Sequence, residues 1–86
     1  LEHVFHVRLV SSPANRVRRI QELNRLSAKA ARRLIEREDR GRERYLRRYF
    51  KADVDDPLLY HLTINTDLIT HEEAARIIAD TVLRHA

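Results

Sequence analysis

The stretch VFHVRLVSSP, residues 4–13, decides how this chain of 86 residues is expected to fold. Residues 4–10 place apolar and β-branched side chains on both faces of a predicted strand. Such a pattern is typical of a parallel sheet, whose strands are covered on both sides. Ser12 and Pro13 then predict a helix start, because serine is a good N-cap and proline fits the first helical position.

The segments that follow continue an alternation of helices and strands. Ser27 is expected to cap a longer helix that runs to about Phe50, and residues 60–66 alternate as in a strand. Thr70 and Glu73 form a capping box in front of a final helix. The order strand, helix, long helix, strand, helix is typical of the α/β class, here with two parallel strands and packing helices. The apolar residues expected to face inward on the final helix are Ala74, Ile77, Ile78, Val82 and Leu83.

The composition suggests that the chain is part of a larger fold. It starts at Leu1 and contains no methionine, and a sheet of two strands is marginal by itself. We therefore expect the strand edges to be completed by a missing amino-terminal half or by another copy of the chain. Gly41 is the single glycine, which excludes a phosphate-binding P-loop, since that motif needs at least two.

Other classes are excluded by what the sequence lacks. The chain has no cysteine, and no apolar run approaches the roughly 20 residues of a membrane span. We therefore expect a cytoplasmic protein with no membrane partner. Asp53, Asp55 and Asp56 are interpreted as turn residues, because the glycine and distal glutamate of a calcium loop are missing, and no metal site is predicted.

The positive charge is concentrated in the long helix. Residues 32–48 hold eight arginines and four acidic residues, which accounts for the whole net charge of +4. Five of these arginines follow each other at intervals of three or four residues and therefore share one helical face. We call this set the arginine ladder; it consists of Arg33, Arg37, Arg40, Arg44 and Arg48.

Two interpretations of the ladder are open from the residues alone. It can be a solvent-exposed helix surface that is stabilised by ion pairs between residues four apart. The expected ion pairs are Glu36 with Arg40 and Glu43 with Arg47. Alternatively, it can bind phosphate, because the forked guanidinium group makes bidentate contacts to phosphate oxygens.

Residues 36–44 read EREDRGRER and resemble the lid segment of cytidylate kinases, which has the form E-R-D-D-R-D-R-N-R. The order of the surrounding segments is similar to the cytidylate kinase-like family over essentially all 86 residues, corresponding to the second half of the family domain with the lid at about 27–50. The segments that carry this resemblance are RVRR at 16–19, YLRRYF at 45–50, DDPLLY at 55–60, INTD at 64–67 and THEEAA at 70–75.

The resemblance implies a fragment of a P-loop nucleoside-monophosphate kinase, a phosphotransferase that uses ATP and Mg²⁺. The parent would bind a nucleoside monophosphate, with cytidylate as the expected acceptor, whereas this chain alone would be inactive and bind no cofactor. The family's sugar-reading aspartate is replaced by Gly41, and the residues that read the base would lie upstream.

The resemblance also implies roles for individual residues. Arg37 would face the ribose, Arg44 would grip the monophosphate, and Arg40 would approach the donor phosphates. Asp39 would orient these guanidinium groups. Additional substrate contacts are expected from Arg33 and Arg48, and contacts near the donor nucleotide from Asn65 and Thr66.

Two other functions remain open from the sequence. The basic helix can bind nucleic acid, although the interleaved acids Glu36, Glu38, Asp39 and Glu43 disfavour that partner. It can also serve as a protein-interaction module that pairs with an acidic partner.

The aromatic residues near the end of the long helix are interpreted as core packing beneath the lid; they are Tyr45, Tyr49 and Phe50.

Overall fold

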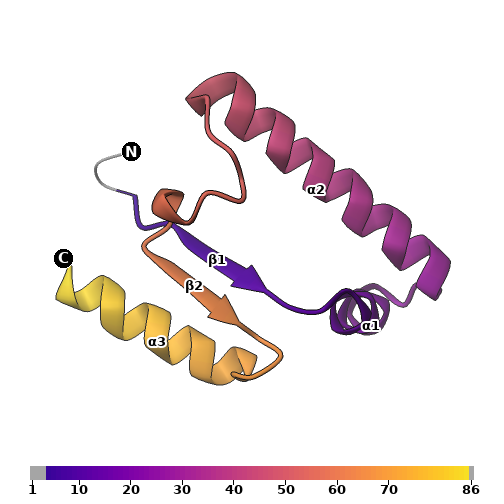
Figure 1. The fold of residues 1–86 in the computed structure, drawn as a ribbon. Coiled ribbons are helices and arrows are strands. Elements are labelled where there is room, and N and C mark those ends of the chain that lie inside the picture. The colour runs from indigo at the N-terminus through magenta and orange to yellow at the C-terminus, as the bar shows by residue number, and fades with distance from the viewer. Residues whose placement is uncertain (1–3, 86) are drawn as a thin grey trace. The chain divides into compact units, whose positions relative to one another are not determined.

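The computed structural model describes residues 4–85 and places them in a mixed α/β arrangement of two strands and three α-helices (Figure 1). The predicted order of elements is confirmed. In chain order they are β1 (Val7–Val10), α1 (Pro13–Asn24), α2 (Ala28–Phe50), the short 3-10 helix η1 (Pro57–Leu59), β2 (Leu62–Asn65) and α3 (His71–Arg84).

The chain divides into two compact units. The first combines Leu1–Ser11 with Pro57–Ala86 and contains both strands and α3, whereas the second is Ser12–Asp56 and contains α1 and α2. The lid segment predicted from the sequence therefore lies wholly within the second unit.

In the first unit, β1 and β2 form the predicted parallel pair. Val7 is paired with Leu62, and the register continues to the pair of Val10 and Asn65. Both strands are shorter than the predicted segments 4–10 and 60–66, because only four residues of each strand are paired with the other. The pairing direction confirms the α/β assignment that the apolar pattern predicted.

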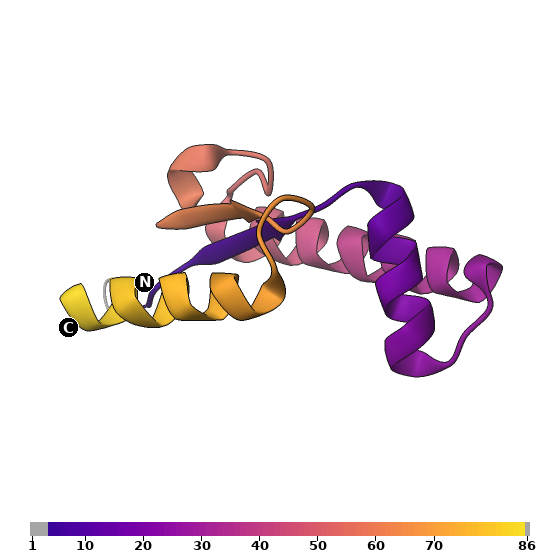
Figure 2. The same cartoon turned by 90° about the horizontal axis from the view of Figure 1, so that it is seen from below.

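Helix α3 follows β2 and runs back alongside the two strands in the opposite direction (Figures 1 and 2). The predicted Thr70 cap is confirmed, since the Glu73 N–H donates to the Thr70 hydroxyl at 3.1 Å. The Glu73 carboxylate accepts from that hydroxyl at 3.2 Å and not from the Thr70 N–H, so the reciprocal bond of a full capping box is not formed among the described residues. Ala74 is buried, but the prediction that Leu83 faces inward is wrong, because Leu83 is 74% exposed. The two strands of this unit offer too little surface to cover the whole apolar stripe of α3.

The second unit is a pair of packed helices whose ends are set by local hydrogen bonds. As predicted, Ser12 and Ser27 cap α1 and α2, and each hydroxyl accepts a hydrogen bond from the backbone N–H three residues later. At their other ends Arg25 and Lys51 adopt left-handed conformations, with φ of 54° and 50°. Their N–H groups return to carbonyls of the last helical turn, which ends both helices.

Within the described part of the chain, no helix combines the length and the apolar character that crossing a bilayer requires.

Candidate functional site

The arginine ladder lies on α2, which is helical without interruption from Ala28 to Phe50. The predicted three- and four-residue spacing therefore places the five positions along one face of a real helix. Gly41 continues this helix and has no positive φ. Ala31 is fully buried, so the helix also has an inward face that fixes how the ladder is presented.

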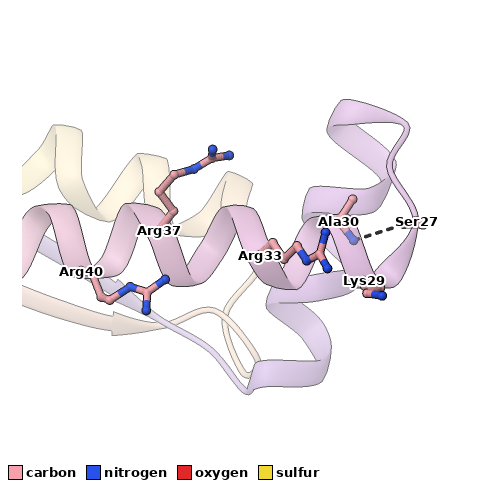
Figure 3. Close-up of a pocket in the computed structure, with 6 residues that line it drawn as sticks. All are labelled: Ser27, Lys29, Ala30, Arg33, Arg37 and Arg40. Atoms are coloured by element: carbon pink, nitrogen blue, oxygen red, sulfur yellow. Dashed lines mark hydrogen bonds between the residues drawn. The ribbon is translucent and has the colours of Figure 1, made fainter.

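The first half of the ladder lines an open groove of about 520 Å³ (Figure 3). Arg33 and Arg40 turn their guanidinium groups to one side of the helix, whereas Arg37 extends to the other side in this view. The groups are thus spread along the helix and do not converge on one point. The complete lining consists of Ser27, Lys29, Ala30, Arg33, Arg37 and Arg40.

Lys29 is the one cation of this groove that the sequence analysis did not select. It precedes Arg33 by four residues and therefore extends the spacing of the ladder by one helical turn towards the start of α2. The same spacing is present in the sequence, but the ladder was defined by arginines alone and therefore did not include this lysine.

The second half of the ladder lies in a separate hollow near the end of α2. Arg44 and Arg48 line it together with Tyr45, Arg47 and Tyr49. The prediction that the aromatic residues here form a core is wrong, since Tyr45 is 55% and Tyr49 62% exposed. Their rings contact each other at a centroid distance of 5.0 Å, and the Arg48 guanidinium lies 5.5 Å from the Tyr49 ring centroid.

The ladder charges are not neutralised by carboxylates of the described residues 4–85. Within residues 4–85, none of the five arginines forms an ion pair with a carboxylate. The predicted pairs of Glu36 with Arg40 and of Glu43 with Arg47 are also absent from this part of the chain, so the interpretation of a helix laced with such pairs is not supported. Exposed pairs of this kind gain only a few tenths of a kcal/mol, which is little compared with the cost of ordering two long side chains.

Asp39 is engaged by arginines from outside the ladder. The two terminal nitrogens of the Arg16 guanidinium, Nη1 and Nη2, donate to the two carboxylate oxygens of Asp39, each at 2.9 Å. The Arg42 guanidinium lies 3.5 Å from one of these oxygens. The hydrogen bonds to Asp39 raise the pKa of Arg16 above its ordinary value. No local sequence pattern predicts this pair, because its members are 23 residues apart on two different helices.

Asn65 and Thr66 belong to the unit that contains the sheet, and the ladder belongs to the other unit. The Asn65 side-chain oxygen accepts a hydrogen bond from the Asp67 N–H at 2.9 Å. The Thr66 hydroxyl donates to the Val10 carbonyl at 3.2 Å. Both polar groups therefore stabilise the turn that follows β2, at the carboxyl ends of the two parallel strands.

No cluster of three or more histidine, aspartate or glutamate side chains with the spacing of a metal site occurs among the residues that the structure describes. We therefore assign none of these residues to a metal ion.

The sequence was compared with known families and proteins. The model of the cytidylate kinase-like family matches residues 1–68, which include both strands, the whole ladder and the turn at Asn65. Helix α3 lies beyond the matched range, so the resemblance expected for nearly the whole chain is confirmed up to residue 68. No curated protein and no solved structure gave a significant match. Since the family model covers well over half of the chain, the chain belongs to the cytidylate kinase-like family.

Proposed function

We propose that this chain supplies the arginine-rich lid of an ATP-dependent nucleoside-monophosphate kinase, with cytidylate as the acceptor that its family suggests. The observation that carries the proposal is the ladder itself. Five arginines share one face of α2 and have no ion-pair partner within residues 4–85. Unneutralised cations on one face repel one another, and an anionic ligand would relieve that repulsion.

The ladder offers the chemistry that phosphoryl transfer requires. The transferred group carries negative charge on its equatorial oxygens, and positioned cations stabilise that charge. In the proposed arrangement Arg37 faces the ribose, Arg44 grips the acceptor monophosphate and Arg40 approaches the donor phosphates. Arg33 and Arg48 are further substrate contacts at the two ends of the ladder. Because arginine side chains are long and forked, the lid closes productively only when phosphate is present.

Asp39 has a different part in this proposal from the one that the family likeness suggested. Its carboxylate holds Arg16 and Arg42, and the bidentate contact with Arg16 joins α1 to α2. It would orient the lid as a whole by fixing the helix that carries the ladder.

The remaining parts of the kinase would come from other sequence. A P-loop for the β- and γ-phosphates of ATP needs at least two glycines, whereas this chain has one. Magnesium would be bound together with that loop, and Asn65 and Thr66 would lie near the donor nucleotide. The two-stranded sheet would be completed by an amino-terminal half or by another copy of the chain, since two strands alone are marginal.

Isothermal titration calorimetry with cytidine monophosphate tests the proposal. Arg37→Gln removes one guanidinium from the groove, and we expect it to weaken binding about fivefold to tenfold. A hydrogen bond from a charged group is worth about 1.5–3 kcal/mol, and solvent exposure reduces that value. Cytidine, which lacks the phosphate, should bind far more weakly than the monophosphate.

Arg32→Gln is the matched control. Arg32 is exposed, is not among the residues that line the groove, and has the same charge as Arg37. Equal losses in the two variants would mean that only net charge matters, and equal binding of cytidine and its monophosphate would contradict the proposal.

A second candidate is binding of single-stranded nucleic acid, which the hollow at the end of α2 favours. Exposed tyrosine rings lie there beside three guanidinium groups. Proteins that bind single-stranded nucleic acid combine aromatic rings, on which bases stack, with positive charges that contact the phosphates. A steep dependence of oligonucleotide affinity on salt, with loss in Tyr49→Ala, would support this candidate over the kinase lid.

A further inference from the structure

Two histidines contact each other at the amino ends of the parallel strands, in the unit that contains the sheet. The backbone N–H of His6 donates to the side-chain Nδ1 of His61 at 3.0 Å. In return, the backbone N–H of His61 donates to the His6 carbonyl at 2.8 Å. We call these two reciprocal bonds the histidine clasp. The clasp continues the contact between the strands beyond their first paired residues, Val7 and Leu62.

The clasp requires a neutral His61 ring. A ring nitrogen that accepts a hydrogen bond carries no proton, so the single ring proton of His61 must lie on Nε2. In the charged form both ring nitrogens are protonated, and Nδ1 would then face the His6 N–H as a second donor. Uptake of a proton therefore replaces an attractive contact by a repulsive one.

The rings around the clasp also favour the neutral form. The His61 ring stacks on Phe5 at a centroid distance of 4.5 Å and lies parallel to the His6 ring at 6.1 Å. The Nε2 atom of His6 is buried and has no hydrogen-bond partner among the described residues. A charged His6 would leave an N–H without an acceptor at this atom, which costs free energy.

The other titratable and charged groups at this end of the unit offer no compensating negative charge. From the end of α3, the His85 ring lies 5.9 Å from Phe5 (Figure 1). From β1, the Arg8 guanidinium lies 5.7 Å from the ring centroid of Tyr60, the residue before His61. Within residues 4–85, neither clasp histidine nor His85 forms an ion pair with a carboxylate.

We propose that the histidine clasp is an acid-sensitive contact that makes the stability of the sheet unit depend on pH. Histidine changes its charge between about pH 5 and 8, and His61 is exposed, so it exchanges protons with the solvent. A base that has to be neutral in the folded state contributes stability that is present at high pH and lost as the pH falls. Acidification opens the clasp and weakens the strand pair at its amino end. The arginine ladder has no part in this device, because it belongs to the other unit.

Urea unfolding of the whole chain at pH 7.5 and at pH 5.5 tests the proposal. The unfolding equilibrium constant of the wild type should be about twofold to fivefold larger at pH 5.5, since one exposed hydrogen bond is lost. His61→Asn offers an oxygen acceptor that does not titrate, so this difference should disappear. His61→Phe keeps an aromatic ring but no acceptor, and it should be less stable than the wild type at pH 7.5 and equally stable at both pH values.

His85→Gln is the matched control. The Nδ1–H of His85 donates to the Thr81 carbonyl at 2.9 Å, a bond that neutral and charged rings both form, so this variant should keep the pH dependence of the wild type. Nitrogen-15 magnetic resonance of the wild-type side chains reports the tautomer directly, and at pH 7.5 Nδ1 of His61 should carry no proton. A protonated Nδ1 at pH 7.5, equal wild-type stability at the two pH values, or an unchanged pH dependence in His61→Asn would each overturn the proposal.

Discussion

At the scale of single residues, the partners of Asp39 decide how much positive charge the ladder keeps. The carboxylate is bound by Arg16 from α1 and by Arg42 one turn along α2. Neither arginine belongs to the ladder, so the one acidic side chain of α2 that forms an ion pair in the described part does not neutralise it. The pair therefore stabilises the two helices and leaves the ladder available for a ligand.

A double-mutant cycle measures this pair. Asp39→Asn and Arg16→Gln should each destabilise the protein, and their coupling free energy should be about 0.5–1 kcal/mol, because both side chains are partly exposed and the contact is bidentate. The readout is the free energy of unfolding in urea.

The pH dependence of this coupling follows from the raised pKa of Arg16. A basic group whose pKa is raised by folding contributes stability that is fully present below the pKa of the unfolded state and is lost as the pH rises through the pKa of the folded state. The contribution from Arg16 should therefore be constant between about pH 6 and 9.

Glu38→Gln is the control for the double-mutant cycle, since Glu38 is exposed and has no ion pair within residues 4–85. Additive effects of Asp39→Asn and Arg16→Gln would contradict the coupling.

At the scale of elements, α2 is a long helix whose stability depends on its ends and on one weak position. The Ser27 cap and the left-handed Lys51 satisfy its terminal backbone groups. Gly41 lies between them in a fully helical segment and has no conformational need for glycine, because its φ is not positive. The helix therefore carries a residue of low propensity in the middle of its charged face.

Gly41→Ala should stabilise the protein by about 0.5–1 kcal/mol, because alanine has higher helix propensity and loses less entropy on folding. A Cβ at this position would meet no atom within 4 Å, so no steric cost is expected. Urea unfolding followed by circular dichroism at 222 nm is the measurement. A loss of stability in Gly41→Ala, with Glu38→Ala unchanged or slightly stabilised, would indicate that α2 needs a bend here.

At the scale of the whole molecule, the sequence predicted what local patterns determine. The order of elements, the caps at Ser12, Ser27 and Thr70 and the parallel pairing followed from N-cap residues and apolar periodicity, and all are confirmed. The groove residues Arg33, Arg37 and Arg40 were selected from their spacing on one helical face, and they do line one hollow.

What could not be predicted depends on contacts between distant parts of the chain. The Arg16–Asp39 pair joins two helices, and no pattern within either helix requires it. The exposure of Leu83 and Tyr49 was missed because an apolar residue shows only a capacity for burial, whereas the available surface decides whether burial occurs. Lys29 was missed because the ladder was defined by arginines alone, although Lys29 continues the same spacing four residues before Arg33.

The central claim is that the ladder recognises the phosphate of a small ligand, and nuclear magnetic resonance of the arginine side chains tests it most directly. The Nε–H signals of a ¹⁵N-labelled chain are followed while cytidine monophosphate is added, with cytidine as the matched ligand without phosphate. We predict saturable shifts for Arg37 and Arg44, with no comparable shifts for Arg32 and Arg76, and with cytidine a shift of Arg37 only at far higher ligand concentration. Shifts of similar size at all arginines, or a ladder that does not respond while Arg76 does, would contradict it.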